Sequence, residues 1–367
     1  MIDYSRAVSN RGNNYRMKKL MERAANGEKL TIAFLGGSIT QGSVATRPEL
    51  CYAYRTYEWW VKTFPKAQFT FVNGGIGGTT SQFGVARVGE DVLAYKPDFC
   101  IIEFSVNDES DEHHMETYEG LVRKVLSSDN RPAVMLVHNV FYNNGASAEL
   151  VHSRIGRHYN IPSVSMAGTI FYDVVRGLIP NREITPDDLH PNDAGHELVA
   201  SVITYGLSQI MEADMDSSEE PIPAPLTANA YEDSVRYRNV NSEPVLNGFV
   251  KDEAAQNHIT ECFRYGWTAK KVGDSITFTV PGTCIGVQFR KSVKLPAPVA
   301  EIVIDGDSST RMILDANFDE TWGDKLELYT VLEHAEYKEH EVTVRIIEAH
   351  ENDAADFYLV SVIGSGR

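Results

Sequence analysis

"KLTIAFLGGSITQGS" (residues 29–43) places a serine directly behind two glycines at the end of an apolar run. The run Leu30–Leu35 is short, apolar and bounded by turn residues, which predicts a buried strand. Gly36 and Gly37 interrupt the run, and Ser38 stands where a following helix would begin. Ser38 has two interpretations, either a helix N-cap whose oxygen accepts a backbone N–H or a nucleophile. The choice depends on partners for the serine elsewhere in the chain.

The sequence around this strand alternates strand-like and helix-like stretches up to about residue 213. Further apolar runs predict strands at 68–73, 98–105, 133–139 and 161–166, and amphipathic stretches between them predict helices. Such alternation indicates an α/β fold, a parallel sheet covered by helices on both faces. In these sheets ligands bind beyond the carboxyl ends of the strands. Ser38 and the loops after Asn73 and Phe104 all lie at such ends.

The pattern changes in the last third of the chain. Residues 214–230, "DMDSSEEPIPAPLTANA", are acidic, then rich in proline and alanine, and predict a linker. Beyond them, five stretches rich in Val, Ile, Thr and Phe alternate with period two, which is typical of an antiparallel β-sandwich or jelly roll. These predicted strands are 274–280, 284–290, 300–306, 340–349 and 357–364. We therefore expect an α/β domain over 1–213, a linker over 214–230 and an all-β domain over 231–367.

Composition and charge exclude several classes of protein. With 367 residues, 43% hydrophobic and 23% charged, the chain has the composition of a soluble globular protein of two domains. Its net charge of −17 argues against binding nucleic acid or an anionic membrane surface. The N-terminus lacks the apolar stretch of a signal peptide, and the four cysteines show no CxxC spacing. These features predict reduced thiols and a cytoplasmic location.

A serine that cleaves esters needs a base and a group that orients the base. "TPDDLHPNDAGH" (185–196) carries Asp187 and His190 three residues apart, a spacing that lets the carboxylate fold back onto Nδ1–H of the imidazole. Asp188 is an alternative orienter with poorer geometry, and His196 falls inside the following helix, where a surface or packing role is expected. A polar loop before a helix would have the same sequence, so this motif alone does not decide between the two interpretations.

Donors for an oxyanion are expected at two other strand ends. "FVNGGIGGTTS" (71–81) is a glycine-rich loop whose backbone N–H groups can approach a ligand closely. Its glycines do not fit the dinucleotide pattern G-x-G-x-x-G. "IIEFSVNDES" (101–110) places Asn107 behind a buried strand, where its side-chain amide is a second candidate donor. A tight turn is the alternative for each loop.

Taken in order, these four motifs resemble those of the SGNH (GDSL-type) hydrolases over roughly residues 28–212. The resemblance implies that Ser38 is the nucleophile, His190 its base and Asp187 the orienter of that base. It also implies an oxyanion hole made of the Ser38 and Gly78 N–H groups and the Asn107 amide. The implied fold is a three-layer α/β/α sandwich with a parallel sheet of about five strands. The implied chemistry uses no metal and no cofactor.

The match leaves a choice between two glycines for the oxyanion donor, and two residues differ from the usual family pattern. Gly78 is chosen as the donor because it follows Asn73 by five residues, with Gly77 as the alternative. Gly37 stands where the family usually has Asp, and Ser105 where it usually has Gly. Both departures leave the nucleophile, base and donor atoms in place and concern the substrate.

Aromatic residues suggest a sugar ligand. The run of Tyr and Trp in 52–60 could stack on sugars, but its helical spacing favours a place in the core. Trp322, in the polar loop "DANFDETWGDK" (315–325), is the candidate substrate-binding residue of the β-domain, with a plug at the sandwich edge as the alternative.

The two-domain layout resembles the two-domain carbohydrate acetylesterases, and among them the intracellular mannan acetylesterases. This resemblance implies removal of O-acetyl groups from acetylated β-mannan oligosaccharides, with the 2-position of mannose as a candidate. It also implies a β-domain similar to carbohydrate-binding modules. The alternatives are a xylan or general sugar acetylesterase, a short-chain lipid or thioester hydrolase, and an inactive glycan-binding protein. A homodimer is compatible with the sequence.

Overall fold

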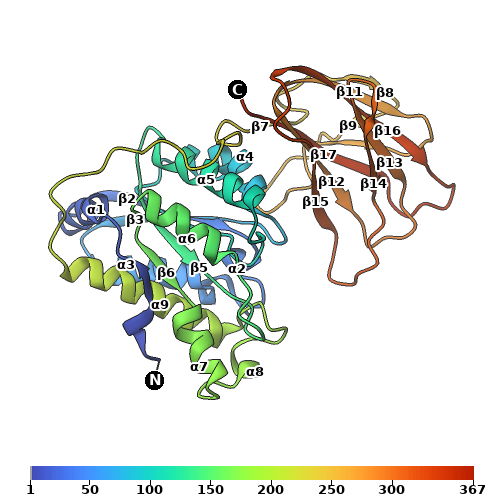
Figure 1. Ribbon diagram of the computed structural model, residues 1–367. Coiled ribbons are helices and arrows are strands. Elements are labelled where there is room, and N and C mark those ends of the chain that lie inside the picture. Colours follow the sequence, from blue (N-terminus) through green and yellow to red (C-terminus); the bar gives the residue numbers. More distant parts are fainter. Residues whose placement is uncertain (1) are drawn as a thin grey trace. The chain divides into compact units, whose positions relative to one another are not determined.

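The computed structural model describes residues 2–367 (Figure 1). The chain divides into two compact units, the first ending at Asn229 and the second beginning at Ala230.

The first unit is built on a six-stranded sheet in the order β1-β6-β5-β4-β2-β3. Its strands are β1 (Val8–Asn10), β2 (Lys29–Gly36), β3 (Gln68–Gly75), β4 (Phe99–Glu103), β5 (Ala133–His138) and β6 (Ser163–Ser165). The strands β2 to β6 are parallel, which confirms the predicted sheet of about five strands. The edge strand β1 pairs antiparallel with β6 and was not predicted, because a three-residue polar strand has no apolar period.

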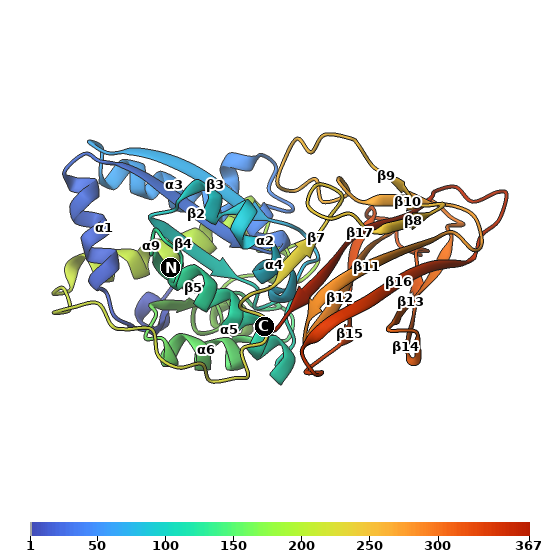
Figure 2. The same ribbon diagram turned by 90° about the horizontal axis from the view of Figure 1, so that it is seen from above.

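Helices cover both faces of this sheet (Figures 1 and 2). One layer contains α1 (Tyr15–Ala25), α3 (Tyr52–Thr63) and α9 (Asp193–Glu212), and the other contains α4 (Ser81–Asp91), α5 (Glu112–Leu126) and α6 (Glu149–His158). Single turns complete the unit: η1 (Tyr4–Arg6), α2 (Ser38–Gln41), η2 (Pro48–Leu50), η3 (Leu93–Tyr95), η4 (Ala167–Phe171), α7 (Tyr172–Val175) and α8 (Asn181–Ile184). Tyr52 and Trp60 of α3 are fully buried, so the aromatic run belongs to the core. The predicted α/β/α sandwich is confirmed.

Three neighbouring strands end at the same level. Gly36 at the end of β2 pairs with Gly75 of β3 on one side and with Glu103 of β4 on the other. Because parallel strands carry their carboxyl ends to one edge of the sheet, the three loops that follow emerge side by side. These loops carry Ser38, the glycine-rich segment and Asn107.

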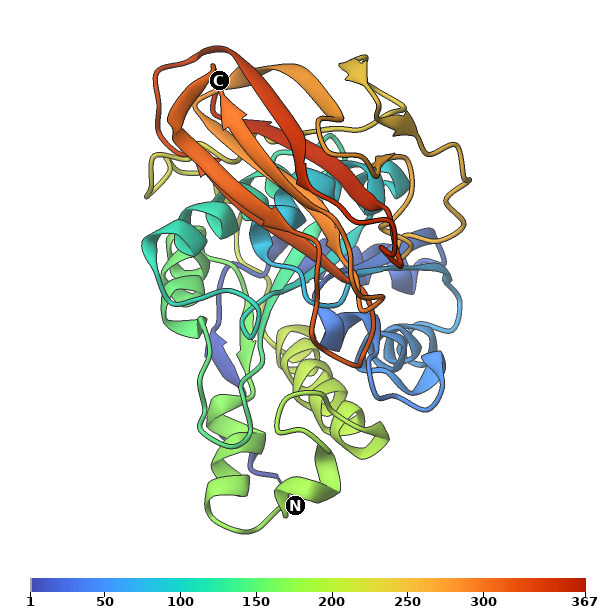
Figure 3. The same cartoon turned by 90° about the vertical axis from the view of Figure 1, so that its right-hand side faces the viewer.

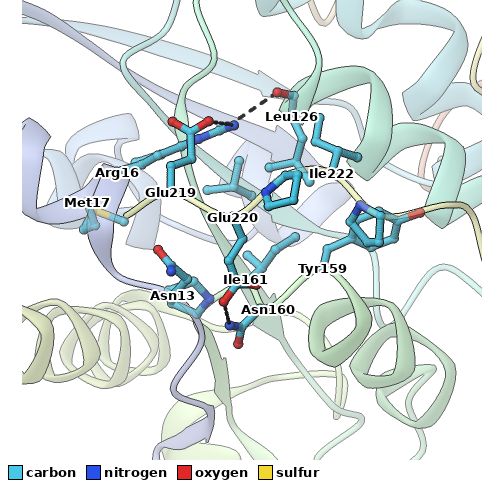
Figure 4. A pocket seen from close by; sticks show the side chains of 15 residues that line it. Asn13, Arg16, Met17, Leu126, Tyr159, Asn160, Ile161, Glu219, Glu220 and Ile222 are labelled. Atoms are coloured by element: carbon cyan, nitrogen blue, oxygen red, sulfur yellow. Dashed lines mark hydrogen bonds and ion pairs between the residues drawn. The ribbon is translucent and has the colours of Figure 1, made fainter. Parts of the chain in front are cut away.

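The segment 214–229, expected as a linker, lies along the first unit (Figure 4). Asp216 accepts the Asn14 backbone N–H at 2.8 Å, and Glu219 forms an ion pair with Arg16 at 3.1 Å. Glu119 of α5 accepts the backbone N–H groups of residues 226 and 227 at 2.7 and 2.8 Å. The small cavity under this segment, about 60 Å³, lies at the amino ends of β5 and β6. It is therefore at the edge of the sheet opposite the Ser38 loop.

The second unit is all-β, as predicted, with two antiparallel sheets that enclose one apolar core (Figure 3). One sheet has the order β15-β12-β17-β10-β9, with β7 also paired to β17, and the other has the order β14-β13-β16-β11-β8. The strands are β7 (Val235–Tyr237), β8 (Val245–Asn247), β9 (Val250–Lys251), β10 (Trp267–Ala269), β11 (Ser275–Gly282), β12 (Cys284–Lys291), β13 (Val299–Ile304), β14 (Asp307–Asp315), β15 (Lys325–Leu332), β16 (Lys338–Glu348) and β17 (Phe357–Ser365).

Five of these strands match predicted stretches, namely β11, β12, β13, β16 and β17. Of the others, β7 to β10 are short, β14 is largely exposed with only Leu314 buried, and in the eight residues of β15 only Leu326 is buried. Strands of this kind carry little of the apolar alternation from which strands are predicted.

Candidate active site

Ser38 follows β2 as the first residue of the single helical turn α2. The N-cap of this turn is Gly37, whose carbonyl accepts the Gln41 N–H at 3.0 Å. The Ser38 hydroxyl therefore does not cap the helix. Its Oγ lies 2.8 Å from Nε2 of His190. Only 6% of the Ser38 surface is exposed. As a first helical residue, Ser38 has a backbone N–H without a partner inside the helix.

His190 is held by Asp187, three residues before it in the loop between α8 and α9. The imidazole Nδ1 lies 2.6 Å from Asp187 Oδ2. The other carboxylate oxygen accepts the backbone N–H groups of Leu189 at 3.1 Å and His190 at 2.8 Å. These bonds fold the chain back on the carboxylate, which is why a spacing of three residues suffices for an aspartate and a histidine to meet.

The charge on Asp187 determines which nitrogen of the His190 ring faces Ser38. Partial burial by itself raises the pKa of Asp187, but hydrogen bonds from the ring and backbone of His190 and the backbone of Leu189 outweigh it and lower the pKa to about 2. The carboxylate is therefore ionised at neutral pH and accepts the Nδ1–H. Nε2 is then left as an acceptor for the Ser38 hydroxyl, the arrangement required of a general base.

The two alternative residues of this loop have other partners. Asp188 has a positive φ of 69°, and its carboxylate binds Asn181 and Arg182. His196 is fully buried and accepts the Tyr52 backbone N–H at 3.2 Å through Nδ1. Burial lowers the pKa of His196 to about 4, so it stays neutral at physiological pH. Its environment is that of a packing residue.

Asn107 lies against Gly37, the residue before Ser38, because a glycine there leaves room for it. The backbone N–H groups of Asn107 and Asp108 both donate to the Phe104 carbonyl, at 3.0 and 2.9 Å, and close a tight turn after β4. A Cβ atom at Gly37 would lie 2.0 Å from Asn107 Oδ1. The glycine that replaces the usual aspartate of the family thus makes space for the amide.

The second departure from the family, Ser105, also has a structural reason. Its side chain is fully buried, and its hydroxyl donates to the Asn139 carbonyl at 2.9 Å. Its backbone carbonyl accepts the Ala148 N–H at 2.7 Å. Ser105 therefore ties the Asn107 turn to the segments after β5 and before α6.

The glycine-rich loop presents two glycines of different character. The Gly77 N–H donates to Gln41 Oε1 at 2.8 Å, and a Cβ at Gly77 would lie 3.5 Å from Ser38 Cβ. Gly78 is exposed with a φ of +68°, a conformation that favours glycine. Its N–H makes no hydrogen bond within residues 2–367. Gly78 is thus the glycine with an available donor, and its role as an oxyanion donor stays a prediction.

Two side chains that the sequence analysis missed hold these loops. Gln41 occupies the Gly77 N–H, and Arg87 of α4 donates to the carbonyls of Gly74 at 2.6 Å and Gly36 at 3.1 Å. Arg87 is fully buried among the apolar residues of its helix. An arginine on the apolar face of a predicted helix is the signal that could have identified it.

Trp322 belongs to the second unit and lies in the loop between β14 and β15. It is 62% exposed, and its ring meets Phe318 edge to face at a centroid distance of 5.2 Å. The indole therefore does not plug the sandwich, and one of its faces can stack on a ligand. Trp267, by contrast, is fully buried in the core between the sheets.

Two kinds of feature are absent from residues 2–367. No group of three or more His, Cys, Asp or Glu side chains in this range is arranged to hold a metal ion. None of the helices described there combines the length and the apolar character that crossing a membrane requires.

The fold and the Asp187–His190–Ser38 chain of hydrogen bonds define an ester hydrolase of the serine type. A sequence profile of the GDSL-like Lipase/Acylhydrolase family matches residues 34–198. The chain belongs to this family, and it is a carboxylic ester hydrolase.

The chain is similar to two solved structures over both units and to one further esterase over about half of its length. The solved structure of a two-domain esterase (CEX) active on acetylated mannans is 65% identical, with a TM-score of 0.98 over all of this chain and 99% of that one. A second structure of a two-domain esterase (CEX) active on acetylated mannans, co-crystallized with mannopentaose, is also 65% identical, with a TM-score of 0.97 over the same shares. An acetylxylan esterase of Geobacillus stearothermophilus is 27% identical over 208 residues, which are 48% of this chain and 93% of that protein.

Proposed function

We propose that this chain is a carbohydrate esterase that removes O-acetyl groups from acetylated mannans and manno-oligosaccharides. The observation that carries the proposal is the 65% identity, over both units, with an esterase active on acetylated mannans. The acetylxylan esterase matches only 48% of this chain and supports the same ester chemistry on a sugar.

In the proposed mechanism Ser38 is the nucleophile and His190 its base. As Ser38 Oγ attacks the acetyl carbonyl carbon, Nε2 of His190, 2.8 Å away, takes the hydroxyl proton. Asp187 keeps the Nδ1–H in place and stabilises the imidazolium that forms. The negative charge that develops on the carbonyl oxygen is stabilised by the N–H groups of Ser38 and Gly78 and by the amide of Asn107.

The tetrahedral intermediate then breaks its bond to the sugar oxygen. His190 returns its proton to that oxygen, the deacetylated sugar leaves, and an acetyl group remains on Ser38. A water molecule attacks this ester with His190 again as the base, so that acetate departs and Ser38 regains its proton. Side chains of the first unit and water thus account for every proton and electron pair.

Trp322 is proposed to stack on a sugar ring of the substrate. What supports this is an indole that is 62% exposed on a loop of the all-β unit. Trp322→Ala is then expected to raise KM for acetylated oligosaccharides several-fold and to leave hydrolysis of 4-nitrophenyl acetate unchanged, because that small ester offers no sugar ring. An equal change on both substrates would contradict the role.

Location and assembly stay predictions. A cytoplasmic enzyme acting on imported oligosaccharides is supported by the buried, reduced thiols of Cys51 and Cys100. A homodimer remains an open expectation.

Acetate release tests the proposed function. The substrates are acetylated manno-oligosaccharides, acetylated xylo-oligosaccharides and 4-nitrophenyl acetate, each with wild type and Ser38→Ala. Rapid release from the mannan fragments that Ser38→Ala abolishes is the expected result. A preference for xylan fragments would establish the second candidate, a xylan acetylesterase. Equal, slow release by both proteins from every substrate would refute the enzyme mechanism.

A further inference from the structure

We propose that Asp108 is a positioning residue that holds the two loops of the oxyanion hole in register. The inference rests on the proposed function, because it concerns the roles of Gly78 and Asn107. Asp108 touches none of the reacting atoms in this assignment and acts through its neighbours.

One carboxylate connects the two loops. Asp108 follows Asn107 directly in the chain, and its Oδ1 accepts the backbone N–H of Ser81 at 2.8 Å. Ser81 is the first residue of α4 and lies three residues after Gly78. Asn107 on the β4 loop and Gly78 on the β3 loop, the two proposed donors, therefore each lie within three residues of the hydrogen bond between Asp108 and Ser81. No other side chain of this turn makes such a bridge within residues 2–367.

The carboxylate is itself fixed from a third element. Its Oδ2 lies 3.0 Å from Nε2 of His152 on α6, and both side chains are fully buried. The ring of Tyr118 on α5 stacks on the imidazole at a centroid distance of 3.6 Å and an interplanar angle of 6°. With both oxygens bonded and the histidine clamped, the carboxylate has one orientation. A buried polar group of this kind is stable only while its hydrogen bonds are kept.

The helix start has a second anchor that does not depend on Asp108. The Ser81 hydroxyl lies 2.7 Å from the Thr117 hydroxyl of α5. Loss of the carboxylate is therefore expected to loosen the two loops while α4 stays in place. This separation makes a positioning role measurable by kinetics.

The conservative substitution should keep most of the function. In Asp108→Asn the amide oxygen can still accept the Ser81 N–H, and the amide nitrogen can donate to Nε2 of His152 when the ring adopts the tautomer with its proton on Nδ1. In Asp108→Ala both bonds are lost. An effect of geometry, as opposed to charge, predicts rescue by asparagine.

The test is a double-mutant cycle on the turnover of 4-nitrophenyl acetate. It compares Asp108→Ala, Asp108→Asn, Asn107→Ala and the double variant Asp108→Ala/Asn107→Ala with wild type. We expect Asp108→Ala to lower kcat about 30- to 100-fold with KM within about threefold, and Asp108→Asn to stay within about fivefold of wild-type kcat. When Asn107 is already alanine, the further fall in kcat caused by Asp108→Ala should be at least about fivefold smaller than in the wild-type background, because the effects of residues that act as a unit are not additive.

Two further variants separate positioning from general destabilisation. Val199→Ala truncates a fully buried side chain of α9 far along the chain from both loops and is the folding control. It should leave kcat unchanged. His152→Phe keeps a ring beside Tyr118 but removes the bond to Asp108, so a three- to tenfold lower kcat is expected even where Asp108→Ala does not fold.

The outcomes are distinguishable from those of the proposed function. Wild-type kcat in Asp108→Ala, or in His152→Phe if Asp108→Ala does not fold, would overturn the positioning role alone. Fully additive losses in the double variant, or an equal loss in Val199→Ala, would do the same. A wild-type protein that hydrolyses no ester would overturn both proposals.

Discussion

Within residues 2–367, two of the three Asp-x-x-His spacings form an Asp–His hydrogen bond, with nearly the same local geometry. In the loop before α9, His190 Nδ1 lies 2.6 Å from Asp187, and in the first turn of α5, His114 Nδ1 lies 2.9 Å from Asp111. Both carboxylates accept the backbone N–H of their own histidine at 2.8 Å, and both are close to half exposed, 46% and 45%. Only His190 has a hydroxyl, that of Ser38, opposite its Nε2.

The difference shows which part of a catalytic site is local. Three residues of chain are enough to close the Asp–His bond, and in α5 the same bond serves the helix, because Asp111 is its N-cap. Nε2 of His114 makes no hydrogen bond within residues 2–367. A base is obtained only where the fold brings such a pair to the carboxyl end of β2. The spacing permits an Asp–His hydrogen bond without requiring it, since Asp193 binds Thr46 and His196 binds the Tyr52 N–H instead. The position of Ser38 is what gives the His190 bond a catalytic use.

Replacing each histidine in turn should give the largest difference between the two pairs. His190→Ala should lower kcat by a factor on the order of 10⁴–10⁶, since nucleophile and base act as a unit. His114→Ala should retain wild-type kcat. Steady-state hydrolysis of 4-nitrophenyl acetate measures both. Similar losses in the two variants would mean that the pairs are not functionally different.

Changing the two carboxylates comes next in size. Asp187→Asn should lower kcat on the order of 10³–10⁴, because the amide no longer keeps the Nδ1–H in place. Asp111→Asn should leave kcat unchanged, since asparagine is an equally good N-cap. The same assay with intact folding, checked by circular dichroism, measures both. The assignment of Asp187 fails if Asp187→Asn is as active as wild type.

The surroundings of Ser38 sharpen the comparison without touching either pair. Gly37→Ala places a methyl group 2.0 Å from Asn107 Oδ1 in the present geometry and should displace the amide. The expected loss in kcat is about 10²–10³, that of one oxyanion donor. Gly89→Ala in α4 is the matched control, because a Cβ there meets no atom within 4 Å. Equal activity of the two variants would remove Asn107 from the mechanism.

Acid stability should not distinguish the pairs. Hydrogen bonds to the carboxylates lower the pKa of Asp187 to about 2 and also lower that of Asp111, although burial opposes them. Each carboxylate therefore stabilises the fold above the ordinary aspartate pKa, and this stabilisation is lost as the pH falls through the lowered value.

Because both groups are well exposed, each contribution should be below about 1 kcal/mol. Urea unfolding at pH 6 and pH 2 gives the change in the free energy of unfolding between the two pH values. This change should be smaller in Asp187→Asn and in Asp111→Asn than in wild type, and the difference is the contribution of that carboxylate. A contribution several times larger for one pair would show that the two are not locally equivalent.

Three parts of this site could be located from the sequence because each follows a predicted strand. Strands β2 and β4 are nearly continuous apolar runs and β3 alternates polar residues with Phe and Val, so their ends, and hence Ser38, the glycine loop and Asn107, could be located. Since parallel strands share an edge, their proximity followed as well.

What could not be predicted depends on contacts between distant residues. The bond between Asp108 and His152 joins residues 44 positions apart, and neither residue differs from an ordinary loop or helix residue in sequence. Likewise the packing of Asn107 on Gly37 depends on the register between β2 and β4, which places the ends of these strands next to each other. Short polar strands such as β1 carry no period and are formed by tertiary pairing alone.

The most direct test of the central claim is to trap the acyl-enzyme. The protein is mixed with an excess of 4-nitrophenyl acetate, quenched with acid within milliseconds, digested and analysed by mass spectrometry, with Ser38→Ala in parallel. The proposed mechanism predicts one acetyl group on the peptide that contains Ser38, and none on the corresponding peptide of Ser38→Ala. Ester hydrolysis at the wild-type rate by Ser38→Ala, or an acetyl group on another residue that forms and decays at the rate of turnover, would contradict it.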